Sequence, residues 1–138
     1  MALWQKTLFI LTSCDKGIYA FHAEGWYAVG GNVSLNGSAT VNGDVNLILT
    51  DNTTLTAASG IVVPQGSSLT VWCQSGKSGA LTAGGIGGAG AVTINGGSIV
   101  SSGGSESGGI ACSTVTVNRG SVTATGNPGI GNSQGTFP

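Results

Sequence analysis

A repeat of 23 residues dominates the C-terminal half of this chain. Residues 85–103 contain, in order, the segments Gly-Ile, Val-Thr-Ile-Asn and Gly-Ser-Ile, and residues 109–126 contain Gly-Ile, Val-Thr-Val-Asn and Gly-Ser-Val at equivalent places. Residues 129–131 begin a third copy. Val92 and Val115, like the other equivalent pairs, are 23 positions apart. A fixed period of this length predicts a solenoid, in which each repeat adds one coil.

Three short apolar segments recur in each repeat and can be traced back through most of the chain. In each segment apolar residues alternate with Ser, Thr or Asn, the period-2 pattern of a strand with one buried side. The abundant Gly, Ser, Thr and Asn oppose helices. We therefore expect a single all-β domain, a three-faced parallel β-solenoid of about four to five coils over residues 26–131. The three segment types begin at Val45, Leu69, Val92 and Val115; at Val33, Leu55, Leu81, Ile99 and Val122; and at Ile61, Ile86, Ile110 and Ile130.

The alternation also predicts which side chains fill the interior of the coils. Asn95 and Asn118 occupy equivalent corners one period apart, where they either form a short hydrogen-bonded ladder or are two unrelated turn residues. The predicted core consists of Val45, Leu47, Leu55, Ile61, Leu69, Val71, Leu81, Ile86, Val92, Ile94, Ile99, Ile110, Val115, Val117, Val122 and Ile130.

Charge and cysteine content exclude several classes of partner. The chain has 4 Lys and Arg, 5 Asp and Glu, and a net charge of -1, so it offers no basic surface for nucleic acid. Its 3 cysteines show no metal-ligand spacing, and Cys73 and Cys112 are predicted to be buried free thiols rather than a disulfide. No apolar run approaches the ~20 residues of a membrane-spanning helix.

The N-terminal residues 1–25 have two interpretations. Leu8-Phe9-Ile10-Leu11 is apolar, and such a segment favours a cap over the first coil, whose core and strand edges would otherwise be exposed. Alternatively, Leu11-Thr12-Ser13-Cys14 resembles a bacterial lipobox, which implies cleavage before Cys14 and lipidation of its thiol. Residues 132–138 are expected to form a C-terminal tail.

Residues 25–131 contain a characteristic series of segments in a fixed order. They are Gly25-Trp26-Tyr27-Ala28-Val29, Asp44 to Leu49, Ser68 to Val71, and the Gly-Ile-Gly and Val-Thr-Ile-Asn-Gly-Gly blocks. This part of the chain resembles the glycine-rich parallel β-helix repeat regions of secreted and cell-surface proteins from Gram-positive gut bacteria, many of them described as adhesin-like or carbohydrate-binding. The resemblance implies a right-handed coil, an extracellular location and no enzymatic activity.

No catalytic or metal constellation is visible in the sequence. Parallel β-helix lyases and hydrolases need clustered carboxylates, but Asp44 and Asp51 lie seven positions apart, which on an extended strand aims them at opposite faces. Two turn residues are the favoured interpretation, over a calcium site. His22 is the single histidine and has no nucleophile motif beside it. We expect no cofactor.

Function is consequently predicted only by class. The leading interpretation is a non-catalytic structural or adhesin-like module that self-associates head to tail through its ends, with Ile130 and Phe137 as the large apolar residues near the C-terminus. A carbohydrate-binding alternative uses Trp26, Tyr27 and Trp72 to stack on a sugar ring. An ice-binding alternative rests on two outward threonine files, Thr70, Thr93 and Thr116, and Thr56, Thr82 and Thr123, the second interrupted by Val100.

Overall fold

The computed structural model of the chain describes residues 8–11, 25–35, 38–74, 76, 78–103, 109–126, 130–132 and 135–136. Every regular element in these ranges is a β-strand, as the alternating sequence predicts. The strands are β1 Leu8–Leu11, β2 Gly25–Val29, β3 Val33–Ser34, β4 Ala39–Thr40, β5 Asp44–Leu49, β6 Thr54–Ala57, β7 Ile61–Val62, β8 Ser68–Cys73, β9 Ala80–Ala83, β10 Ile86–Gly87, β11 Ala91–Ser102, β12 Ile110–Ala111, β13 Thr114–Thr125, β14 Ile130–Asn132 and β15 Gly135–Thr136.

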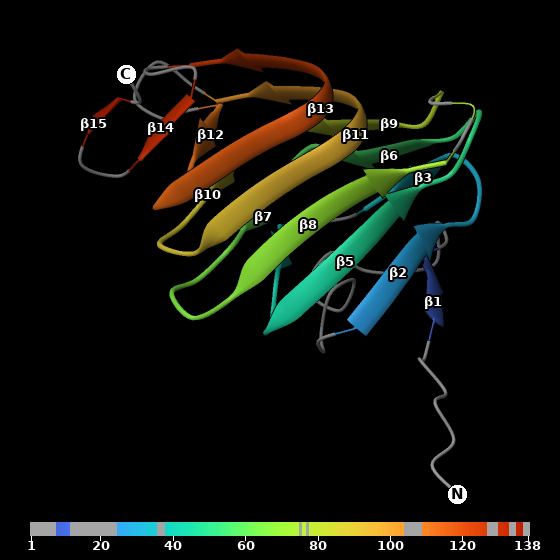
Figure 1. The fold of residues 1–138 in the computed structure, drawn as a ribbon, viewed down its shortest axis with the longest axis horizontal. Helices are drawn as coiled ribbons and strands as arrows, with labels where there is room; N and C mark the ends of the chain where they lie inside the picture. Colours follow the sequence, from blue (N-terminus) through green and yellow to red (C-terminus); the bar gives the residue numbers. More distant parts are fainter. Residues whose placement is uncertain are drawn as a thin grey trace, which may run out of the picture.

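The strands stack as a right-handed parallel β-solenoid of about 4 turns (Figure 1). The first face contains β1, β2, β5, β8 and the first halves of β11 and β13. The second face contains β3, β6, β9 and the second halves of β11 and β13, so that these two long strands join both faces into a 9-stranded sheet. The third face is a separate 6-stranded sheet in which only β15 pairs antiparallel.

The observed register confirms the three predicted segment types. On the first face Val45 pairs with Leu69, Leu69 with Val92, and Val92 with Val115. The second and third faces keep the equivalent alignment from Val33 and Ile61 onward. The third face also contains β4, which pairs with β7 and which the sequence analysis missed because Ala39 lacks the Gly-Ile signature.

The core runs as a continuous apolar column inside the coils. The predicted interior positions from Val45 through Ile110 are all buried. Ser101 lies in this interior beside Ala83, and its hydroxyl donates to the carbonyl of Gly109 at 2.5 Å. A buried hydroxyl with this partner avoids the cost of an unsatisfied polar group.

The prediction of a uniformly buried core is wrong in the last coil. Val117 is 45% exposed, and Val115, Val122 and Ile130 are only partly buried against the core. Among the described strands β13 pairs with β11 alone, so its inward side chains are covered from one side. Alternation correctly gave the direction of these side chains, but burial also requires a coil on each side.

Candidate functional site

Successive coils turn the corner between the first and second faces by paths of different length. In the coil of β8, residues 72–79 lie between Val71 on the first face and Ala80 on the second. In the next coil, residues 95–97 alone connect the equivalent positions Ile94 and Ser98. Strand β8 therefore continues beyond the point at which β11 and β13 turn to the second face. Its last residues, Trp72 and Cys73, form a ledge beside the corners of β11 and β13.

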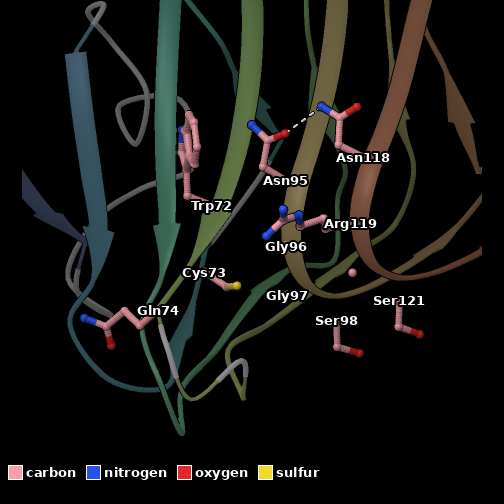
Figure 2. Close-up of a pocket in the computed structure, with 11 residues that line it drawn as sticks. Trp72, Cys73, Gln74, Asn95, Gly96, Gly97, Ser98, Asn118, Arg119 and Ser121 are labelled. Atoms are coloured by element: carbon pink, nitrogen blue, oxygen red, sulfur yellow. Dashed lines mark hydrogen bonds between the residues drawn. The ribbon is translucent and has the colours of Figure 1, made fainter.

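A groove of about 710 Å³ lies along this ledge (Figure 2). The volume lies within the range of sites for small ligands, roughly 300–1,000 Å³. One side is formed by the end of β8 and the other by the corners of β11 and β13. The lining residues are Trp72, Cys73, Gln74, Asn95, Gly96, Gly97, Ser98, Asn118, Arg119, Gly120 and Ser121.

Glycine is required at the tight corners because backbone atoms approach closely there. Gly97 and Gly120 have φ values of 90° and 100°, which side chains of L residues rarely allow. A Cβ on Gly120 would lie 2.7 Å from the carbonyl oxygen of Gly97, and a Cβ on Gly96 would overlap the Sγ of Cys73. The corner glycines thus keep the floor of the groove free of side chains.

The ledge itself is held by Asp51. The carboxylate of Asp51 accepts hydrogen bonds from the backbone N–H groups of Gly76 and Ser78 at 3.0 and 3.3 Å. Its own N–H donates to Oε1 of Gln74 at 2.8 Å. Asp44, at the other end of β5, accepts a hydrogen bond from the hydroxyl of Ser68 at 2.8 Å. Asp51 is a turn residue, as predicted, whereas Asp44 is the first residue of β5 and not a turn residue.

Trp72 lies at one end of the groove, and its ring stacks on Trp26. The ring centroids are 6.0 Å apart with an interplanar angle of 27°, a favourable arrangement for an aromatic pair. Nε1 of Trp72 donates to Oδ1 of Asn46 at 3.1 Å, and this bond fixes the orientation of the indole. Trp72 remains 38% exposed, in agreement with its predicted outward direction. The pair forms an apolar platform on the first face.

The proposed role of Tyr27 in this platform is wrong. Tyr27 is 1% exposed and belongs to the core cluster, where it pairs with Leu47 across β2 and β5. Adjacent residues of a strand point to opposite sides of the sheet, so Trp26 and Tyr27 cannot both face outward. Paired residues of neighbouring strands point to the same side of a sheet, and Leu47 was predicted to lie in the core. Pairing of Tyr27 with Leu47 therefore places Tyr27 inside as well.

Beyond the platform, side-chain amides and one cation line the groove. Nδ2 of Asn118 donates to Oδ1 of Asn95 at 2.7 Å, so of the two alternatives for these residues the hydrogen-bonded ladder is the one that the structure shows (Figure 2). The pairing register shifts at this corner, so that the backbone of Asn95 lies opposite Arg119 rather than Asn118. Arg119 was not singled out in the sequence. Arg119 lines the groove because of the register shift and because the corners of successive coils differ in length. The difference in length between segments 72–79 and 95–97 is the sequence feature that could have indicated this.

The two threonine files exist as predicted. Thr70, Thr93 and Thr116 are paired neighbours on the first face. Thr56 pairs with Thr82, and Val100 separates Thr82 from Thr123 on the second face. Paired strands are spaced by ~4.8 Å, so the first file is a regular row of hydroxyl and methyl groups, whereas Val100 breaks the row in the second file.

The remaining predicted residues divide between described and undescribed parts of the chain. Cys112 is buried as predicted, whereas Cys73 is half-buried at the groove and both thiols are free. Ile130 packs on the core, and β1 pairs parallel with β2 at the N-terminal edge of the first face. Cys14 and Phe137 lie outside the described residues.

The described ranges contain no group of three or more His, Cys, Asp or Glu side chains placed to hold a metal ion. They also contain no helix long and apolar enough to cross a membrane.

Comparison with protein families, with curated proteins and with solved structures finds no match to this chain.

Proposed function

We propose that this protein is a non-catalytic carbohydrate-binding β-solenoid module, and that a saccharide binds in the groove beside Trp72. The observation that carries the proposal is the aromatic platform of Trp26 and Trp72 at the end of a groove lined by amides and hydroxyls. A sugar ring has apolar C–H faces and a polar rim. It therefore fits a site that offers an aromatic surface and hydrogen-bonding groups side by side.

The polar side chains of the groove supply both donors and acceptors. Gln74, Asn95 and Asn118 carry amides, and Ser98 and Ser121 carry hydroxyls. An amide and a hydroxyl each donate and accept, so together they can satisfy sugar hydroxyl groups in several orientations. The hydrogen bond between Asn118 and Asn95 fixes both amides in place, which lowers the conformational entropy lost on binding.

The other interpretations are less well supported by these observations. An ice-binding surface needs a flat and regular threonine array, but Val100 interrupts the second file and Trp72 projects from the first face. An extracellular, bacterial, adhesin-like role is compatible with a saccharide-binding module. It is supported by the resemblance of the repeats to surface-protein regions.

A glycan array with matched variants tests the proposal. We expect reproducible binding to one group of glycans by the parent protein, and loss of at least about ten-fold in affinity for Trp72→Ala, since an aromatic hot spot is typically worth 2 kcal/mol or more. Val100→Ala is the control, because Val100 is 38% exposed, as Trp72 is, but lies on the second face. Binding that Trp72→Ala leaves unchanged, or a blank array, would reject the proposed function.

A further inference from the structure

The charged residues of the described chain have unequal surroundings. Asp51 is engaged by the backbone of Gly76 and Ser78, and Asp44 is engaged by Ser68. Arg119 is exposed at the corner of β13 and lines the groove. Within the ranges that the structure describes, Arg119 is the one charged residue of the groove lining, and no carboxylate pairs with it.

The position of Arg119 brings its guanidinium to the polar half of the groove. Its backbone lies opposite Asn95 across the shifted register, and Figure 2 shows its side chain between the corner glycines and the two asparagines. The other polar groups in the lining are neutral amides and hydroxyls. The electrostatic character of this part of the groove is therefore positive, although the whole chain has a net charge of -1.

From this placement we infer that the groove selects an anionic saccharide, with Arg119 contacting a carboxylate or sulfate group of a sugar unit next to the one that stacks on Trp72. The inference rests on the proposed function, which it deepens by naming the chemical class of the ligand. Arg119 is then a specificity-determining residue, while the aromatic platform supplies affinity for saccharides in general.

The chemistry of arginine suits this role. A guanidinium remains charged at all ordinary pH values and presents a planar set of five N–H donors. Planar carboxylates accept two of these donors at once, and sulfate oxygens accept them in a similar arrangement. The flanking Asn95 and Asn118 amides would bind neighbouring hydroxyl groups. No described carboxylate lines the groove to repel an anion.

Calorimetric titration with matched saccharide pairs tests the inference. One pair is a uronic acid oligosaccharide and its carboxyl-reduced neutral counterpart, and the other is a sulfated oligosaccharide and its desulfated form. All titrations contain a chelator, so that divalent cations cannot bridge the anion to the protein. We expect at least one charged member to bind roughly five-fold more tightly than its neutral partner, because an exposed ion pair contributes up to about that factor. The preference should weaken as salt is added.

The variants separate this inference from the proposed function. Arg119→Gln should bring the affinities for the charged and the neutral member of a pair to the same value, and Arg119→Lys should retain part of the preference for the charged member. Equal binding of charged and neutral members, or a preference that persists in Arg119→Gln, overturns the inference. In that case the proposed function still stands if the neutral member binds and Trp72→Ala removes its binding. If no member of either pair binds, the inference is rejected.

Discussion

Single inward side chains determine whether a coil can close, because the interior column is lined by apolar side chains that cannot solvate a charge. Ile94 is 0% exposed and lies between Val71 and Val117 in the stack. We expect Ile94→Asp to lower the free energy of unfolding by about 4 kcal/mol or more, because it places an unpaired carboxylate in the core. Chemical denaturation measures the change. Thr93→Asp, on the outward neighbour, is the control and should change stability by less than about 1 kcal/mol; equal effects of the two would contradict the register.

The buried thiol of Cys112 gives the fold a pH dependence. Burial raises the pKa of Cys112 from its ordinary value of 9.0 to about 11, because desolvation disfavours the thiolate. Since the folded pKa lies above the unfolded pKa, the protonated thiol contributes stability that is fully present below pH 9 and is lost as the pH rises through about 11.

The free energy of unfolding should therefore fall more steeply between pH 9 and 11 in the parent than in Cys112→Ala. Denaturant titrations at several pH values measure both slopes. Identical slopes in the two proteins would show that this thiol ionises equally in the folded and unfolded states. The comparison of slopes cancels contributions from other titrating groups.

At the scale of residues, the inward or outward direction of a side chain was predictable and its degree of exposure was not. Period-2 alternation placed Ile94 inside and Trp72 outside. Tyr27 departs from the prediction because adjacent residues of a strand point to opposite sides, so that an outward Trp26 places Tyr27 in the core. The exposure of Val117 depends on which strands cover β13, and no local pattern contains that information.

Among the structural elements, the connections between strands rather than the strands themselves create the site. The long connection after β8 and the short corners of β11 and β13 together make the groove. The strand register was predictable from the sequence because equivalent apolar residues recur at a fixed period. The groove was not predicted, because it depends on comparing the corners of adjacent coils.

Substitution of Asp51 tests whether the long connection after β8 shapes the groove. Asp51→Ala removes the carboxylate that accepts from Gly76 and Ser78, so the connection after β8 should loosen. We expect the free energy of unfolding to fall by only about 1–2 kcal/mol, because the strands and the core are unchanged. Saccharide affinity should fall several-fold in the same variant.

The control for this prediction is Ser113→Ala, which removes a side-chain hydrogen bond to the carbonyl of Ala89 at 2.7 Å away from the groove. It should reduce stability by a similar or smaller amount and leave saccharide affinity unchanged. If Asp51→Ala also binds saccharide as the parent does, the ledge is not what shapes the site.

At the scale of the whole molecule, the last long strand of the stack, β13, is covered from one side only. Val117 in β13 is 45% exposed, and β13 pairs only with β11 among the described strands. An open parallel strand edge is a template for another strand, and we propose that a second copy docks on it head to tail. The low net charge opposes such contact only weakly.

We therefore expect the sedimentation coefficient to increase with protein concentration in the micromolar range. Val117→Lys should suppress this increase, because it places a charge among the apolar side chains that the second copy would cover. Thr123→Lys, on the outward side of the same strand, is the control for added charge. A parent protein that sediments as a monomer at every concentration would exclude self-association through this end.

A saccharide bound between the Trp72 ledge and the corners of β11 and β13, as we propose, should change the NMR signals of the groove lining. Two-dimensional NMR of the ¹⁵N-labelled protein, titrated with a saccharide selected on the array, measures these changes. The largest shifts should occur at the indole N–H of Trp72 and at the side-chain amides of Asn95 and Asn118, with smaller shifts at Gly97 and Ser121 in the floor. Shifts confined to the second or third face, with the Trp72 indole unmoved at saturation, would contradict this proposal.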